Sequence, residues 1–412
     1  MTVDQREAED QRHAEGQRST EDQRPTEDQR DAGEQCDGED RLDGGPARAT
    51  GGLMARWWRV TGAAGIVVGA AAAGAGAVLA AQRIAVGRMR LRPDPAAGEP
   101  LGKLRGRPLT VLAADGVPLH VEISGPDDAP VTVIFTHGYT LNQDCWHYQR
   151  AGLAGSARLV FWDQRGHGRS GRSDPAHVSM GRLGEDLHAV LMAAAPGNGP
   201  VVLVGHSMGG MTIMALARQH PELFGTKIAG VALISTTAAD VDPAAWLPAL
   251  LRPVVRMTAP SVLREAAEGR GRALVQLSRE AGASLAFLGT RHMAFGDPHV
   301  SPALVDYLER IIRATPFDVV AQFYLALLEH DERAALEVLG QVPAVVLIGE
   351  ADRLIPPRLS TDLAAAIPGA ELIRVPGAGH VVILERPDIV NDAIDSLIAR
   401  ASATGTSHGQ SA

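Results

Sequence analysis

Residues Val201 to Gly210 read V-V-L-V-G-H-S-M-G-G, and this stretch decides the fold of the chain. Four apolar residues lead directly into a serine between glycines, and the apolar stretch Met211 to Ala217 follows. The pattern predicts a buried strand, a sharp turn at Ser207 and a helix. So short a turn forces the serine into a strained backbone conformation, and Gly205 and Gly209 remove Cβ atoms that would clash there.

The turn has a chemical consequence for Ser207. Its hydroxyl is expected to stand above the end of the strand, where the N–H of Met208 at the start of the helix points to the same place. The alternative is a glycine-rich turn with an incidental serine, because G-x-S-x-G is short enough to occur by chance. The strand before the motif and the helix after it favour a nucleophile.

The composition is that of a globular protein and excludes some functions. The chain has 412 residues, of which 45% are hydrophobic and 21% charged. Its net charge of −9 is concentrated in the first 50 residues, which hold 15 Asp/Glu against 7 Arg. The remainder has no basic face, so nucleic acid is not an expected partner. Of the two cysteines only Cys145 lies in a foldable region, which excludes a disulfide framework there.

The N-terminal segment is a charged repeat. Gln-Arg recurs every six residues from Gln5 to Arg30, and the first 50 residues have one leucine and no aromatic residue. It cannot bury enough apolar surface to fold, so residues 1–53 are predicted to form a disordered tail. Met54 is an alternative translation start, because M-A-R-W-W-R stands directly before an apolar run.

That apolar run, residues 60–81, has 22 residues without a charge and is flanked by arginines. Its length suits one membrane crossing, so 56–92 is predicted to be a transmembrane anchor, followed by a linker at 93–106. The count of flanking arginines favours a cytoplasmic domain. The alternatives are a signal peptide cleaved after Ala77, which would make the protein secreted, and an Ala-rich soluble helix.

From Arg107 onward, short apolar strands alternate with helical segments. Strands are expected at Pro108–Ala113, Pro118–Ile123, Val131–Phe135, Arg158–Trp162, Val201–Val204, Ile228–Ser235, Val345–Ile348 and Leu372–Val375. This alternation predicts an α/β fold, in which a mostly parallel twisted sheet has helices on both faces. The core is assigned to 107–238 and 341–402, the interrupting helical segment 239–340 to a cap, and 403–412 to a disordered C-terminus.

Polar residues follow the strands at their carboxyl ends, where ligand-binding and active sites lie in sheets of this kind. In chain order these are His137-Gly138-Tyr139, Asp163 to Ser170, Ser207, Gly349 to Asp352, and Gly379-His380. A serine, an acid and a histidine therefore reach one edge of the sheet. The combination is chemically informative, because a serine nucleophile needs a base and that base needs an acid to hold its tautomer.

Together these motifs resemble the α/β-hydrolase fold over about Arg107 to Ala401. The resemblance implies that Ser207 is the nucleophile, Asp352 the acid and His380 the base. It also implies an oxyanion hole made by the backbone N–H groups of Tyr139 and Met208. Glu350 and Asp240 are alternative acids, but Asp352 stands at the loop position that this fold uses.

The remaining motif residues are expected to shape the site. They are His137, Gly138, His167, Gly205, His206 and Gly209. Asp163 and Arg165 are expected to tie together the loop after the fourth strand. We assign no cofactor. We also assign no metal, because His292, His299 and His330 are too far apart in sequence to suggest ligands.

The resemblance implies covalent acyl transfer to water through an acyl-enzyme. A serine at this turn argues against dehalogenases and epoxide hydrolases, which place aspartate there. We expect a hydrolase of a carboxylic ester or thioester, and the leucine-rich cap favours a lipophilic small-molecule substrate. C–C bond hydrolases and cofactor-free perhydrolases use the same triad, so these two activities remain alternatives. A non-catalytic protein that binds a hydrophobic ligand is the alternative from another class.

Overall fold

The computed structural model describes residues 81–242, 261 and 283–409. The predicted tail at 1–53 and nearly all of the apolar run at 60–81 lie outside these ranges. No single helix in the described ranges is long and apolar enough to cross a membrane, although α8 (Pro302–Ala314) and α9 (Phe317–Leu328) pass that test together as a pair bent by 91°. Membrane attachment, the side of the membrane and signal cleavage therefore stay predictions.

The described residues form a single eight-stranded sheet in the order β1-β2-β4-β3-β5-β6-β7-β8. Its strands are β1 (Arg107–Leu112), β2 (Pro118–Ser124), β3 (Thr132–Thr136), β4 (Arg158–Trp162), β5 (Val201–His206), β6 (Ile228–Ile234), β7 (Ala344–Gly349) and β8 (Glu371–Val375). β2 pairs antiparallel with both β1 and β4, and the remaining neighbours are parallel. The predicted mostly parallel α/β sheet is confirmed.

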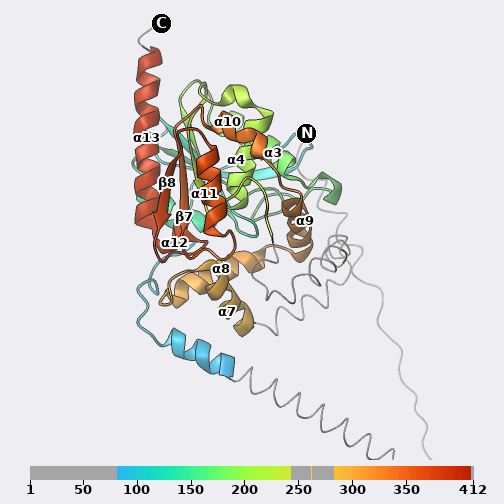
Figure 1. The fold of residues 1–412 in the computed structure, drawn as a ribbon, viewed down its shortest axis with the longest axis vertical. Coiled ribbons are helices and arrows are strands. Elements are labelled where there is room, and N and C mark those ends of the chain that lie inside the picture. Colours follow the sequence, from blue (N-terminus) through green and yellow to red (C-terminus); the bar gives the residue numbers. More distant parts are fainter. Residues whose placement is uncertain (1–80, 243–260, 262–282, 410–412) are drawn as a thin grey trace, which may run out of the picture. The chain divides into compact units, whose positions relative to one another are not determined.

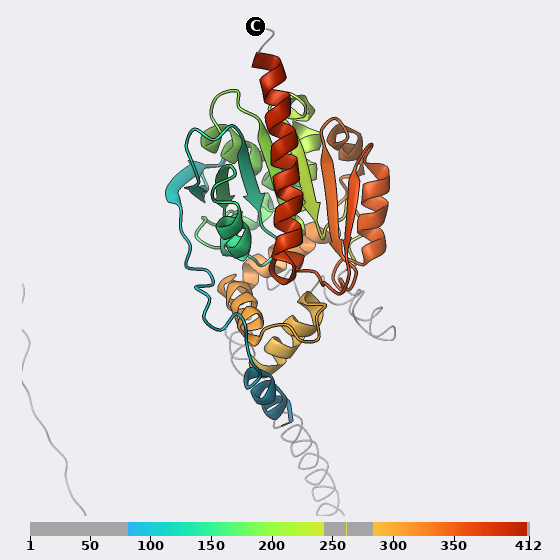
Figure 2. The ribbon, with the colours of Figure 1, turned by 90° about the vertical axis from the view of Figure 1, so that its left-hand side faces the viewer.

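Helices cover both faces of this sheet (Figure 1). α3 (Met180–Ala194), α4 (Met208–Gln219) and α11 (Pro357–Ala366) pack on one face, and α2 (His147–Gly152) and α13 (Pro387–Gly409) on the other. Figure 2 shows α13 running across its face of the sheet. β5 is buried on both faces, which explains its unbroken apolar sequence. α13 extends to Gly409, and the disordered C-terminus expected at 403–412 stays a prediction.

A helical insertion lies between β6 and β7. Its described elements are α7 (Ala283–Ala294), α8, α9, η4 (Arg333–Ala335) and α10 (Leu336–Leu339). We call α7, α8 and α9 the cap helices; they lie at the carboxyl ends of the parallel strands (Figures 1 and 2). The short elements elsewhere are η1 (Gln143–Trp146), η2 (Pro175–His177), η3 (Pro221–Leu223) and α12 (Val382–Glu385).

The segment that precedes β1 packs against the cap. Residues 81–90 are helical, and Val86 is buried against the same apolar cluster as the cap residue Phe287. Arg90 pairs with Asp306 on α8 at 2.7 Å, and the carboxylate of Asp94 accepts from the backbone N–H of Ala303 at 2.9 Å. The arginine-rich flank of the apolar run is therefore fixed to the first turns of α8.

Candidate active site

Ser207 lies in the strained turn that its flanking glycines predict. Its φ of 53° and ψ of −119° place it in a region that side-chain-bearing residues rarely adopt. The turn is held by hydrogen bonds from Ser207 N–H to the carbonyl of Ile234, 2.9 Å, and from the Thr236 hydroxyl to the carbonyl of Ser207, 2.8 Å. Ser207 alone in the stretch 201–210 is not buried.

The two glycines of the motif are required by close backbone packing. A Cβ on Gly209 would lie 2.0 Å from the carbonyl oxygen of Thr136, and a Cβ on Gly205 would lie 2.5 Å from the carbonyl oxygen of Gly209. Gly138 is equally constrained, because its Cβ would lie 2.8 Å from Nδ1 of His206. These glycines let the third strand, the turn and the start of α4 approach one another closely.

Asp352 and His380 form a hydrogen-bonded pair beside this turn. His380 Nδ1 lies 2.9 Å from Asp352 Oδ2. The other carboxylate oxygen, Oδ1, accepts from the backbone N–H groups of Leu354 and Ile355 at 2.8 and 2.9 Å. Both members of the pair are buried. The carboxylate is thus fixed in orientation, and it can hold a proton on Nδ1 and leave Nε2 of His380 able to accept one.

The alternative acids do not reach this histidine. Glu350 pairs with Arg374 at 3.0 Å, with half-exposed side chains on both partners. Asp240 pairs with Arg333 at 2.6 Å, and its side chain is 71% exposed. Each of these carboxylates pairs with an arginine near the surface, so Asp352 is the acid that the fold brings to His380.

Tyr139 and Met208 are the residues whose backbone N–H groups are predicted to bind an oxyanion. The N–H of Met208 is the first of α4, a position with no partner in the helix's own hydrogen-bond ladder. Tyr139 lines the same cavity as Ser207, and its hydroxyl donates to the carbonyl of Val320 on α9 at 2.5 Å. The next residue, Thr140, has φ 60° and accepts at its carbonyl from Thr315 at 2.9 Å. The cap therefore anchors the loop that carries one proposed oxyanion donor.

Three other histidines near the site are buried and neutral. Burial lowers the pKa of His137 to about 4, and burial followed by a neighbouring histidine lowers the pKa of both His167 and His206 to about 3. Each ring is used within the fold. His206 donates from Nε2 to the carbonyl of His380, 2.9 Å, and His137 accepts at Nε2 from the N–H of Gln164, 2.9 Å. They join neighbouring strand-end loops, so His380 is the histidine positioned to act as a base.

Asp163 and Arg165 tie loops together behind the site. The Asp163 carboxylate accepts from the N–H groups of Gln143 at 2.8 Å and Arg169 at 2.9 Å. Arg165 forms a two-bond ion pair with Asp186 on α3, at 2.5 and 2.6 Å. Both residues are buried, and neither lines the cavity.

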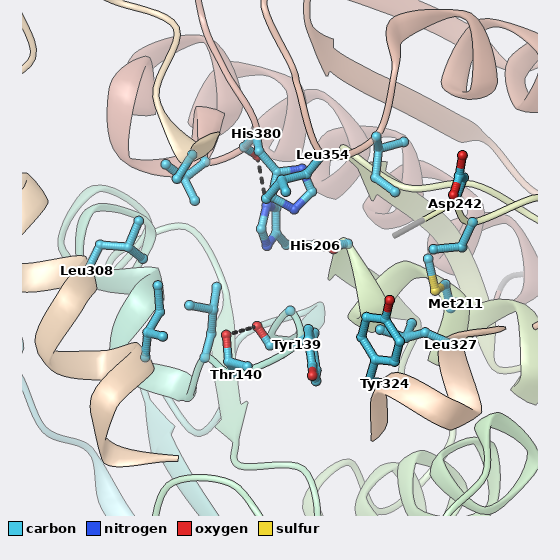
Figure 3. Close-up of a pocket in the computed structure, with 18 residues that line it drawn as sticks. Tyr139, Thr140, His206, Met211, Asp242, Leu308, Tyr324, Leu327, Leu354 and His380 are labelled. Atoms are coloured by element: carbon cyan, nitrogen blue, oxygen red, sulfur yellow. Dashed lines mark hydrogen bonds between the residues drawn. The ribbon is translucent and has the colours of Figure 1, made fainter. Parts of the chain in front are cut away.

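A cavity of about 250 Å³ joins these groups. Ser207 and His380 both line it, together with apolar residues of the cap: Ala294, Leu308, Ile312 and Leu327. Figure 3 shows His380 on one side of the cavity and the cap residues Leu308 and Leu327 around it. Its polar lining includes Asp242 and the cap residue Tyr324, which the sequence did not single out. No hydrogen bond between the Ser207 hydroxyl and His380 is present among the described residues, and such bonds are often long before substrate binds.

Glu385 is a second residue that sequence reasoning missed. Its carboxylate accepts from the N–H groups of Gly379 at 2.5 Å, Gly296 at 2.9 Å and Asp297 at 2.9 Å. Burial raises its pKa, and the backbone donors oppose that rise. Gly379 directly precedes His380, and Gly296 follows α7. Glu385 thus joins the loop that carries His380 to the cap. No motif marks it, because two of its three partners, Gly296 and Asp297, are distant in sequence.

The fold is that of an α/β protein, and its strand-end loops bring Ser207 and the Asp352–His380 pair to one cavity. Residues 133–393 match the model of the alpha/beta hydrolase family, and the chain belongs to that family.

Known proteins of this kind are similar along most of their length. A pimeloyl-[acyl-carrier protein] methyl ester esterase from Stenotrophomonas maltophilia is 29% identical over 69% of this chain and 98% of its own. An sn-1-specific diacylglycerol lipase from Mus musculus is 26% identical over 69% of this chain and 86% of its own. The solved structure of an esterase from Thermogutta terrifontis covers 72% of this chain and 99% of its own, with 24% identity and a TM-score of 0.55, and so shares the fold.

Proposed function

We propose that this protein is a serine hydrolase that cleaves a carboxylic ester or thioester of a small lipophilic substrate. The observation that carries the proposal is the buried Asp352–His380 pair in the same cavity as Ser207, which the backbone holds in a strained turn. The names of the relatives support ester hydrolysis, since they include a methyl ester esterase and a diacylglycerol lipase. The apolar cap residues of the cavity support a lipophilic substrate.

The proposed reaction has two halves that use the same residues. Ser207 Oγ attacks the ester carbonyl while its proton passes to Nε2 of His380, and the new imidazolium is stabilised by Asp352. The N–H groups of Tyr139 and Met208 would bind the oxyanion. His380 then gives the proton to the leaving alcohol or thiol, which leaves an acyl-enzyme. Water repeats the sequence on the acyl group and releases the acid.

A fluorophosphonate probe tests the proposal, because it labels only serines that are activated as nucleophiles. We expect the wild-type chain to be labelled and Ser207→Ala to be unlabelled. Ser235→Ala is the matched control: Ser235 is buried at the end of the neighbouring strand, has φ 48°, and its hydroxyl has no hydrogen-bond partner among the described residues. It should keep full labelling.

Turnover of a p-nitrophenyl ester series from acetate to palmitate then gives the reaction and the acyl length. Folded wild type that is neither labelled nor active on any of these esters would favour the ligand-binding alternative. Labelling without ester turnover would favour the C–C hydrolase or perhydrolase alternatives.

Glu385 is proposed as a positioning residue for His380. Glu385→Ala leaves three backbone N–H groups without their acceptor, so the free energy of unfolding should fall by about 3 kcal/mol. A displaced His380 loop should also lower kcat by about tenfold or more with little change in KM. Urea unfolding and initial rates measure the two effects. Glu329→Ala, at an exposed position, is the control, and an equal loss of kcat in both variants would contradict the assignment.

A further inference from the structure

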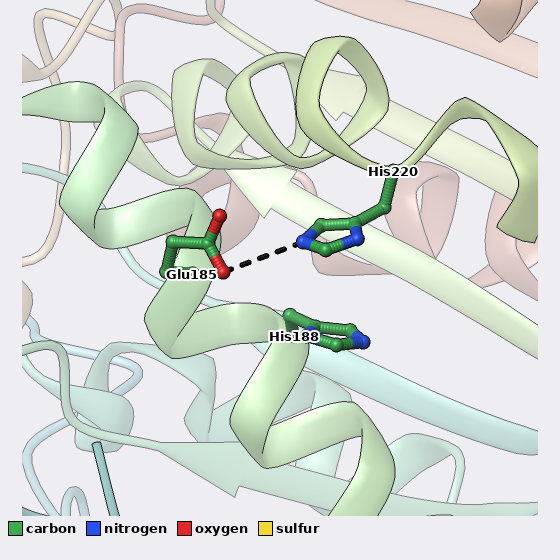
Figure 4. A group of neighbouring side chains, drawn as sticks. All are labelled: Glu185, His188 and His220. Atoms are coloured by element: carbon green, nitrogen blue, oxygen red, sulfur yellow. Dashed lines mark hydrogen bonds and ion pairs between the residues drawn. The ribbon is translucent and has the colours of Figure 1, made fainter. Parts of the chain in front are cut away.

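A second group of ionisable side chains lies outside the active site, where α3 meets the end of α4 (Figure 4). Glu185 and His188 are one turn apart on α3, and His220 is the residue at which α4 ends. Glu185 Oε2 lies 3.3 Å from His220 Nε2. The rings of His188 and His220 stack with centroids 4.0 Å apart and planes at 20°. One ligand atom from each of the three residues lies within 4.8 Å of the others.

The surroundings of these histidines suit metal coordination. Burial, and then the neighbouring His220, lowers the pKa of His188, which favours the neutral ring that a metal ion requires. The other nitrogen of His220, Nδ1, faces the carboxylate of Glu222 at 3.4 Å. A carboxylate on the far nitrogen is the usual outer partner of a metal-bound histidine, because it fixes the ring and raises its basicity.

The two helices are rigidly held at this place. A Cβ on Gly184 would lie 3.0 Å from the carbonyl carbon of Ala215, so α3 and α4 approach closely there. Gln219, next to His220, donates to the carbonyl of Gly181 at 2.9 Å. The three candidate ligands therefore stand on fixed backbone, with donor atoms within 4.8 Å of one another.

We propose that Glu185, His188 and His220 form a binding site for a divalent transition-metal ion of the zinc type. Two imidazole nitrogens and one carboxylate oxygen suit Zn²⁺, Co²⁺ or Ni²⁺, whereas Mg²⁺ and Ca²⁺ require mainly oxygen ligands. All three side chains are partly exposed, so water can complete the coordination. The 12 residues of α4, about 18 Å in length, separate His220 from Ser207. The ion would join α3 to the helix that carries Ser207 and take no part in the reaction.

The test uses the full chain without a polyhistidine tag, stripped with EDTA and dialysed against micromolar ZnCl₂. Wild type should retain one more zinc ion per chain than the double variant His188→Gln/His220→Gln. ZnCl₂ should also raise the Tm of wild type by about 2–4 °C, because the ion binds only the folded state. The Tm of the double variant should not rise. Glu185→Gln, which keeps both histidines, should show a smaller rise than wild type.

The matched control is His177→Gln/His299→Gln. It removes two exposed histidines that each lie 3.8–3.9 Å from an aspartate, and its zinc content and Tm gain should equal those of wild type. Equal zinc retention and equal Tm gain in wild type and His188→Gln/His220→Gln would overturn the proposal. So would an equal Tm gain of wild type with MgCl₂, which would indicate general screening of charge.

Discussion

Asp352→Asn is expected to lower kcat/KM for ester hydrolysis by about 10⁴-fold. The carboxylate oxygen Oδ1 accepts from two backbone N–H groups, so the amide oxygen of asparagine should occupy that position. The amide NH₂ would then face Nδ1 of His380, where Oδ2 now lies 2.9 Å away. An NH₂ group can only donate there, which forces the proton onto Nε2. His380 in that tautomer cannot accept the proton of Ser207.

Glu350→Gln is the matched control for this substitution. It makes the same carboxylate-to-amide change on the same loop, at a half-exposed side chain whose partner is Arg374. An exposed ion pair contributes at most about 1 kcal/mol, and this one does not contact the cavity, so kcat/KM should stay within about twofold of wild type. Initial rates on one p-nitrophenyl ester compare the two variants. A larger loss in Glu350→Gln than in Asp352→Asn would reverse the assignment of the acid.

The free energy of unfolding is expected to fall steeply as the pH is lowered from about 6.5 to 5. In the folded state the pKa of His137 is about 4 and those of His167 and His206 are about 3. In the unfolded chain each returns to about 6.5. Between these values the unfolded state binds protons that the folded state does not, so stability is full above pH 6.5 and is lost on acidification. Each histidine contributes up to about 1.4 kcal/mol per pH unit.

By pH 5, proton binding to these three histidines in the unfolded chain should lower the free energy of unfolding by several kcal/mol. This is a large part of the stability of a typical domain. Urea unfolding between pH 7.5 and 5 measures this slope. His167→Asn should reduce this slope by the contribution of one proton. The asparagine amide can still donate to the carbonyl of Arg165, but it does not titrate. His299→Asn, at an exposed position, should leave the slope unchanged. An unaltered slope in His167→Asn would contradict the assigned origin of the acid sensitivity.

The sequence by itself determined the features that depend on neighbouring residues. The apolar runs at Val201–Val204 and Val345–Ile348 form fully buried strands, as their length and their unbroken apolar sequence predict. Gly205 and Gly209 predicted the turn at Ser207, since a Cβ at either position would meet backbone. The strand alternation predicted the parallel sheet and the edge to which Ser207, Asp352 and His380 come.

Only the tertiary structure decided which of several similar side chains meet. Asp352 and Glu350 are two residues apart, yet one is buried against His380 and the other pairs with Arg374 on β8. Glu385 contacts Gly296, and His220 contacts Glu185 and His188, across long stretches of chain. Local sterics and periodicity fix the backbone within each element. Contacts between loops and helix ends depend on how distant elements pack, and no local pattern carries that information.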